Sequence, residues 1–169
     1  FPDSALFDVD GIRAASQAAL TEEPGAALQY GATEGYQPLR EQLAAFMASK
    51  GAPDVAPEQL IVTTGSQQAL DLLGKTMIGP GDKVIVEGPT FLATIQCFRL
   101  YGAEVISAPI DGEGVNVDAL ERLIAEHRPK LVYLIPTFGN PSGATLSLAR
   151  RKKVLELAVQ YQTLVVEDD

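Results

Sequence analysis

The sequence predicts an α/β fold with a largely parallel β-sheet. From Leu60 onward, short apolar runs rich in Val, Ile and Leu alternate with longer segments whose apolar residues recur at helical spacing. Glycine and proline separate these segments, and alternation at such lengths is typical of βαβ crossovers. The chain has 169 residues, of which 46% are hydrophobic and 21% charged, so it suits about one domain with a sizeable core.

The first third of the chain predicts helices rather than strands. The expected helices run from Val9 to Leu20 and from Pro38 to Gly51, with a glycine-punctuated loop, residues 30–36, between them. Prolines at positions 53 and 57 prevent the second helix from continuing. We therefore expect an N-terminal helical segment in residues 1–55, leading into a main domain in residues 56–169.

The main domain is expected to alternate strands and helices in chain order. The expected strands are Leu60–Thr64, Lys83–Glu87, Glu104–Ile110, Lys130–Ile135 and Thr163–Glu167. The expected helices pass through residues 69–77, 91–101, 117–127 and 147–161.

Charge and composition exclude several classes of function. A net charge of -9 and a pI near 4.6 argue against a nucleic-acid partner, which would require a basic face. No apolar run approaches the roughly 18 residues that a membrane span needs, and no signal peptide is visible. One cysteine, Cys97, excludes an internal disulfide framework and agrees with a reducing compartment, so we expect a cytoplasmic protein.

Chemically useful side chains follow the expected strands at four places. These are Gly65-Ser66-Gln67, Gly88-Pro89-Thr90-Phe91, Asn140 and Asp168. Ligands of open α/β sheets collect beyond the carboxyl ends of the strands, so these positions are the candidate site. A metal site is not expected, because His127 is the only histidine and lies at the end of a helix.

Each of these positions also has a structural explanation. Ser66 with nearby backbone amides could bind an anion such as phosphate, or it could simply cap its helix. Asn140-Pro141 could present an amide to a ligand, or form an ordinary turn. Asp168 could pair with a cation, bind a metal, act as a base, or belong to a solvated acidic strand end. The residues by themselves leave these alternatives open.

Five motifs in this order resemble the large domain of class I/II aminotransferases, fold type I enzymes that use pyridoxal phosphate (PLP). They are Tyr30 with Gly35 and Leu39-Arg40, Thr64 to Leu70, Glu87 to Phe91, Pro136 to Gly143, and Val166 to Asp169. The resemblance spans essentially the whole chain and is closest to the branch of 2-aminoadipate and kynurenine aminotransferases. It implies a three-layer αβα domain and transamination between an amino acid and a 2-oxo acid.

The resemblance also implies a role for each site residue. Gly65, Ser66 and Gln67 would hold the phosphate of PLP, Phe91 would stack on the ring, Asn140 would donate to the ring hydroxyl oxygen, and Asp168 would keep the pyridine nitrogen protonated. Asp168 is chosen over Asp169 because family members place this aspartate three residues before a tyrosine. Tyr30 would reach the phosphate in the other subunit, which implies a homodimer in amino-acid metabolism.

Two parts of the family pattern are missing from the sequence. The lysine that forms the Schiff base lies downstream of the aspartate in this family, and Lys75, Lys83, Lys130, Lys152 and Lys153 all lie elsewhere. The small C-terminal domain is also absent, and the chain opens on Phe1 without Met. We therefore expect a fragment of a larger enzyme that is inactive by itself. The rival interpretation is a PLP-binding effector domain of a transcription regulator, which shares this fold.

Overall fold

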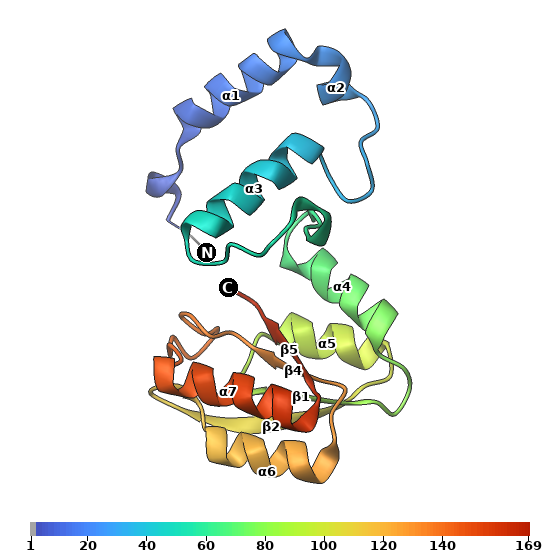
Figure 1. Ribbon diagram of the computed structural model, residues 1–169, viewed down its shortest axis with the longest axis vertical. Helices are drawn as coiled ribbons and strands as arrows, with labels where there is room; N and C mark the ends of the chain where they lie inside the picture. Colours follow the sequence, from blue (N-terminus) through green and yellow to red (C-terminus); the bar gives the residue numbers. More distant parts are fainter. Residues whose placement is uncertain (1–2) are drawn as a thin grey trace. The chain divides into compact units, whose positions relative to one another are not determined.

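The computed structural model describes residues 3–169, which divide after Val62 into two compact units (Figure 1). The first unit is helical. Its elements are the 3₁₀ helices Ser4–Leu6 and Pro57–Gln59 and the α-helices α1 (Val9–Glu22), α2 (Pro24–Leu28) and α3 (Gln37–Ser49). The helices expected near residues 9–20 and 38–50 are thus present as α1 and α3.

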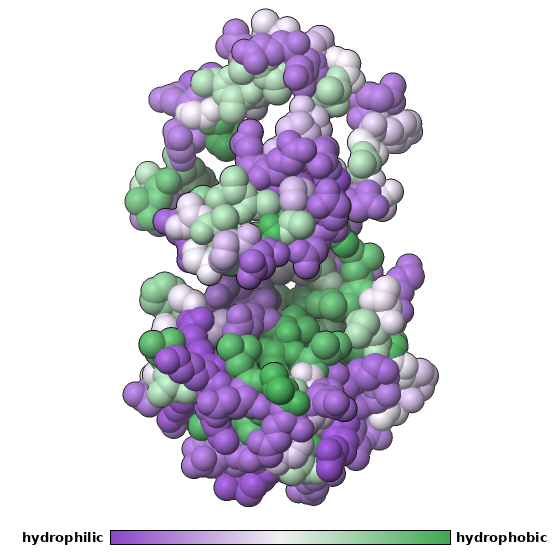
Figure 2. Space-filling model, viewed as in Figure 1, coloured by the Kyte–Doolittle hydropathy of each residue, from purple (hydrophilic) through white to green (hydrophobic). Residues whose placement is uncertain are grey.

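The first unit buries little of its surface. Neither α1 nor α2 contains a buried residue, whereas α3 buries Arg40 and Ala44. The Arg40 guanidinium donates to the Pro57 carbonyl at 3.1 Å, which ties α3 to the following 3₁₀ helix. Figure 2 shows apolar residues at the surface of this unit, and Val9, Ile12 and Leu20 of α1 are all more than half exposed.

The second unit contains a five-stranded sheet. Its elements are α4 (Ser66–Met77), β1 (Lys83–Gly88), α5 (Leu92–Leu100), β2 (Glu104–Asp111), β3 (Gly114–Val115), α6 (Val117–His127), β4 (Leu131–Leu134), α7 (Leu148–Tyr161) and β5 (Leu164–Glu167). The strand order is β3-β2-β1-β4-β5. All pairs are parallel except the short β2–β3 hairpin. This confirms the predicted α/β class with a mostly parallel sheet.

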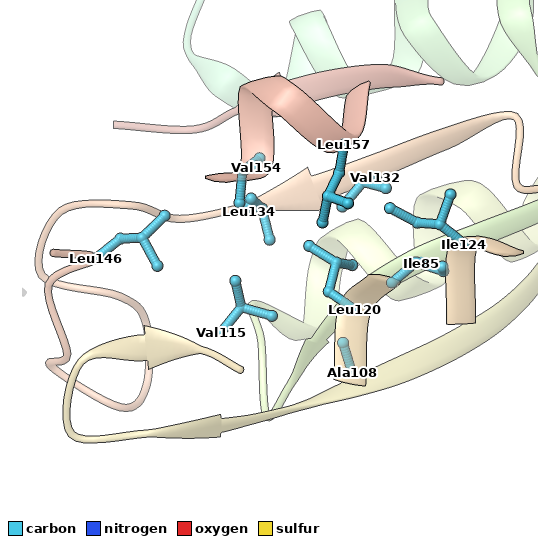
Figure 3. Close-up of a cluster of buried hydrophobic side chains, with 10 residues drawn as sticks. All are labelled: Ile85, Ala108, Val115, Leu120, Ile124, Val132, Leu134, Leu146, Val154 and Leu157. Atoms are coloured by element: carbon cyan, nitrogen blue, oxygen red, sulfur yellow. The ribbon is translucent and has the colours of Figure 1, made fainter. Parts of the chain in front are cut away.

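Helices cover both faces of the sheet, and a separate core lies under each layer. Successive residues of β1 point to opposite faces, so Val84 and Val86 join one cluster and Ile85 joins the other. The cluster around Ile85 packs under α6 and α7 through residues such as Leu120 and Leu157 (Figure 3). The other cluster includes side chains of α4 and α5. The central strands β1 and β4 are therefore buried from two sides.

Local signals explain the ends of the central helices. Asn116 caps α6 by accepting a hydrogen bond from the Ala119 amide at 2.9 Å. Arg128 ends the same helix in the left-handed conformation, with φ of 48°. The predicted span of Val117 to His127 agrees with α6, because Asn116 before the helix and Pro129 after it are signals readable in the sequence. Among residues 3–169, none of the helices has the length and apolar character needed to cross a membrane.

The strand predicted at Leu60–Thr64 is wrong. These residues form no strand, and the side chains of Ile61 and Val62 are 62% and 37% exposed. The Val62 amide donates to the Glu34 carbonyl at 2.9 Å and so takes part in a loop contact, not a sheet ladder. β-Branched residues favour a strand only where a neighbouring strand accepts their hydrogen bonds. Within residues 3–169 this segment has no such neighbour.

Candidate active site

A cavity of about 300 Å³ lies at the carboxyl ends of β4 and β5, within the second unit. We call it the strand-end cavity. It is lined by Ser66, Phe91, Ile135, Thr137, Phe138, Asn140, Asp168 and Asp169. Four of the residues predicted from the sequence, Ser66, Phe91, Asn140 and Asp168, therefore meet at one place although they are widely separated in the chain.

The other predicted residues lie outside the lining. Gly65 and Gln67 flank Ser66 at the start of α4. Tyr30 belongs to the first unit, where its side chain is 99% exposed. A larger hollow of about 420 Å³ lies at the opposite ends of the strands, beside Lys83 and Lys130. In a parallel sheet the carboxyl ends carry the ligand, so we assign the site to the strand-end cavity.

The start of α4 offers free donors to the cavity. Gly65, at a φ of 97°, is the N-cap of this helix, so Ser66 is its first residue and not its cap. No side chain among the described residues caps the helix by a hydrogen bond. The Thr64 amide is instead held by Oε1 of Gln68 at 2.7 Å, which fixes the approach to the turn. The first amides of α4, with the Ser66 hydroxyl, can therefore bind an anion.

Phe91 enters the cavity from the turn after β1. It is the residue before α5, in an extended conformation with φ of -62° and ψ of 119°, and it is only partly buried. Glu87, near the end of β1, stabilises the start of this turn, because its Oε2 accepts a hydrogen bond from the Ile135 amide at 2.9 Å. That bond links β1 to the end of β4 beyond their last paired residues. The aromatic ring supplies the cavity with a flat apolar surface.

Asn140 lies in the loop that joins β4 to α7. The loop closes on itself, because the Leu146 amide donates to the Pro136 carbonyl and the Gly139 amide to the Ala144 carbonyl, each at 2.8 Å. Arg151 of α7 clamps the base of this loop. Its guanidinium donates to the Leu146 carbonyl at 3.0 Å and, at 2.9 Å each, to the Pro136 carbonyl and the Thr137 hydroxyl. The Asn140 amide is thus carried by an ordered loop.

Asp168 follows β5 directly and is fixed at two points by β4. Its backbone amide donates to the Leu134 carbonyl at 3.0 Å. Its Oδ2 accepts a hydrogen bond from the Tyr133 hydroxyl at 2.6 Å. Asp169 also lines the cavity, but its side chain is exposed and accepts no hydrogen bond among the described residues. The structure thus distinguishes the two carboxylates.

Sequence reasoning missed Glu87, Tyr133 and Arg151 as supports of the site. Glu87 and Tyr133 lie inside strands, and Arg151 lies within the first turn of α7. Tyr133 had one readable signal, since a phenol in a fully buried strand needs a partner for its hydroxyl.

The lining can bind one particular kind of molecule. It offers donors for an anion, an aromatic ring for a flat face, an amide for a hydroxyl oxygen, and a carboxylate for a protonated ring nitrogen. Residues 3–169 contribute no lysine to the lining. The same residues contain no cluster of three His, Cys, Asp or Glu side chains able to bind a metal ion.

Comparison with known proteins agrees with this donor set. The family model described as aminotransferase class I and II matches residues 4–169. The aromatic-amino-acid aminotransferase 1 of Thermococcus litoralis is 43% identical over 173 residues, covering 99% of this chain and 42% of that protein. The chain thus spans about two fifths of the length of this relative.

A solved structure and a regulator are also similar. LysN, the alpha-aminoadipate aminotransferase of Thermus thermophilus, was solved in complex with N-(5'-phosphopyridoxyl)-L-leucine. It matches with a TM-score of 0.90 and 42% identity, covering 100% of this chain and 42% of its own. YjiR of Escherichia coli, an uncharacterized HTH-type transcriptional regulator, is 35% identical over 143 residues, covering 84% of this chain and 30% of that protein.

Proposed function

This chain belongs to the class I and II aminotransferase family, and from that membership we propose that the protein transfers the amino group of an amino acid to a 2-oxo acid, with PLP in the strand-end cavity. The observation that carries the proposal is the convergence of Ser66, Phe91, Asn140 and Asp168 on that cavity. PLP presents a phosphate, a flat ring, a ring hydroxyl and a pyridine nitrogen, and this lining offers one partner for each.

We assign the binding roles as follows. Ser66, with Gln67 and the first amides of α4, binds the phosphate, and Gly65 allows the turn that exposes these donors. Phe91 packs against the ring, and Asn140 donates to the ring hydroxyl oxygen. The Asp168 carboxylate accepts a hydrogen bond from the protonated pyridine nitrogen, and its negative charge favours the protonated form of that nitrogen. When bound, PLP supplies an electron sink for the charge left when the substrate Cα loses a proton.

The group that moves this proton is proposed to lie outside the described residues. Residues 3–169 place no lysine at the cavity, so we propose that the 169-residue chain alone does not complete transamination. For the full-length protein we propose a cytoplasmic homodimer in amino-acid biosynthesis. In that dimer, Tyr30 contacts the phosphate bound by the partner subunit, and residues 56–169 form part of the PLP-binding domain. The first substrates to assay are aromatic amino acids and 2-aminoadipate, which appear in the names of the relatives.

The similarity to YjiR supports a second candidate, a PLP-binding effector domain of a transcription regulator. The same cavity would then bind the cofactor without turnover. The net charge of -9 argues against a DNA-binding face on this chain itself. A DNA-binding segment in the full-length protein, with PLP binding but no amino transfer, would favour the regulator.

The full-length protein with PLP tests the proposal directly. With PLP bound it should absorb visible light. It should also convert an amino acid and 2-oxoglutarate to the corresponding 2-oxo acid and glutamate. Asp168→Ala should weaken PLP binding about 10- to 100-fold, because a hydrogen bond to a charged group contributes roughly 1.5–3 kcal/mol. It should also lower turnover by about 10²- to 10³-fold.

Asp169→Ala is the matched control, since Asp169 lines the same cavity but lacks the Tyr133 contact. It should change PLP affinity less than about 3-fold, well under 1 kcal/mol. A full-length protein that stays colourless with PLP would contradict the proposal. Equal losses in both variants would remove the assignment of Asp168.

A further inference from the structure

Tyr133 carries a polar group in the centre of the sheet. Every residue of β4 is buried, and Tyr133 is fully so. Its ring packs edge-on against Phe98, with ring centroids 6.1 Å apart and planes at 84°. Both rings belong to the core cluster beneath α4 and α5. The phenol therefore approaches the strand-end cavity from inside the protein, not from solvent.

The Tyr133 hydroxyl donates its hydrogen bond to the Asp168 carboxylate. It donates to Asp168 Oδ2 at 2.6 Å, a short distance typical of a hydroxyl bound to a carboxylate. Burial, and then the hydrogen bond to Asp168, raise the pKa of Tyr133 well above its usual value. The phenol thus keeps its proton and acts as a donor across the working pH range.

The contact leaves Asp168 with one oxygen for a ligand. Oδ2 is occupied by the phenol, whereas Oδ1 accepts no hydrogen bond within the described part of the chain. The neighbouring residue of β4, Leu134, holds the Asp168 backbone amide. Two adjacent residues of a buried strand thus fix both the backbone and the side chain of the carboxylate that lines the cavity.

We propose that Tyr133 is a positioning residue, whose phenol holds the Asp168 carboxylate in the orientation that accepts the pyridine nitrogen of the cofactor. The inference rests on the proposed function, and it adds a residue that does not itself line the cavity. A carboxylate on a strand end can otherwise rotate, and each freed torsion weakens a hydrogen bond that depends on orientation. The simpler explanation is that the phenol only satisfies its own buried hydroxyl.

A paired-ligand experiment separates these explanations without measuring activity. The two probes are pyridoxamine 5'-phosphate and its 1-deaza analogue, in which a C–H replaces the ring nitrogen. Equilibrium binding of both is measured on the full-length protein, and their affinity ratio reports the contact between Asp168 and the nitrogen. A loss of packing weakens both probes alike, whereas a loss of orientation lowers the ratio.

The variants are Tyr133→Phe and, as a matched control, Tyr101→Phe. The Tyr101 hydroxyl also donates to an aspartate at 2.6 Å, Oδ1 of Asp71, but neither residue lines the cavity. Tyr133→Phe removes one oxygen and keeps the ring that packs on Phe98. The unfolding midpoint of each variant verifies that it is folded. Two further variants, Asp168→Asn alone and Asp168→Asn combined with Tyr133→Phe, complete a double-mutant cycle.

We expect Tyr133→Phe to lower the affinity ratio about 10-fold and Tyr101→Phe to change it less than about 2-fold. In the Asp168→Asn background, Tyr133→Phe should leave the ratio unchanged. An affinity ratio that Tyr133→Phe leaves unchanged, whether or not both probes bind more weakly, would overturn the inference while the role of Asp168 stands. A wild-type protein that binds both probes equally well would overturn the role of Asp168, and the inference with it.

Discussion

At the residue scale, Glu87 is an unusual feature of the strand ends, because a carboxyl group is buried there. Its side chain is 6% exposed, and its one hydrogen bond is accepted from the Ile135 amide. Burial raises the pKa of Glu87 above its ordinary value, and the hydrogen bond from Ile135 opposes that rise. The folded protein therefore binds the Glu87 proton more tightly than the unfolded chain does.

This difference makes stability depend on pH in a predictable direction. Below its ordinary pKa, Glu87 is protonated in both states and costs nothing. As pH rises toward the raised pKa of the folded state, the unfolded state loses the proton first, so the free energy of unfolding falls. Glu87→Gln cannot titrate and keeps an oxygen acceptor for Ile135. The stability advantage of Glu87→Gln over wild type should therefore grow from about pH 4 upward.

Urea unfolding at several pH values measures that difference. Glu104→Gln, on an exposed position of the neighbouring strand β2, controls for removal of a charge alone. If the stability advantage of Glu87→Gln over wild type is constant or shrinks with rising pH, burial does not raise the pKa of Glu87.

Residues differ in how far the sequence reveals them. Phe91, Asn140 and Asp168 were predictable because each follows a strand of one parallel sheet, whose carboxyl ends share an edge. Ser66 was expected to follow the strand Leu60–Thr64, which does not form, and it lines the cavity as the first residue of α4. Tyr133 was not singled out, because its role depends on the register between β4 and β5, which places it opposite Val166 near the end of the strand. Register is a property of two paired strands, so the sequence of one strand alone does not predict it.

At the element scale, the loop between β4 and α7 depends on Arg151. The guanidinium donates three hydrogen bonds to backbone and side-chain oxygens at the base of the loop. The adjacent Arg150 makes a comparable set of contacts to a different element, since it bonds Asp111 and the carbonyls of Gly114 and Val115 in the β2–β3 hairpin. Two neighbouring arginines of one helix thus support two separate turns.

We predict that Arg151→Met weakens pyridoxamine 5'-phosphate binding about 10-fold, because the Asn140 loop loses its clamp. Arg150→Met should leave this affinity within about 2-fold. Both variants should lose about 1.5–3 kcal/mol of stability, as expected for hydrogen bonds from a charged group. Calorimetric binding and thermal unfolding measure the two effects. If both arginines affect cofactor binding equally, the loop does not depend on Arg151 specifically.

The two errors in the predicted strands share one cause. Leu60–Thr64 has the composition of a strand but no partner among residues 3–169, whereas β3 has only two residues, one of them glycine, and pairs because a tight turn returns the chain to β2. In each case tertiary pairing decides, not local propensity. Helices such as α6 were predicted well, since their periodicity and end signals are local.

At the scale of the whole molecule, the stabilising core is confined to one part of the chain. Both clusters of buried hydrophobic residues lie in residues 63–169. The parallel strands β1 and β4, at the centre of these clusters, bury their side chains on both faces. The first unit has α3 as its only helix with buried residues among those described, so local stability should differ sharply between the two units.

Hydrogen exchange of the 169-residue chain, read by mass spectrometry, measures this contrast. Helix α1 has 14 residues and buries none of them, and isolated helices of that length are marginal in water. We therefore expect its amides to exchange within about a factor of 10 of the unfolded rate, which corresponds to an opening free energy of about 1.4 kcal/mol or less. Amides of β1 and β4 should be protected by the full unfolding free energy, because their ladders lie between the two core clusters.

Helix α6, similar in length to α1 but with Leu120 and Ile124 buried, is the internal control, and its amides should be protected like those of the strands. Protection of α1 equal to that of α6 would mean that its apolar residues are covered in solution, and a concentration series would then show whether a second copy of the chain covers them.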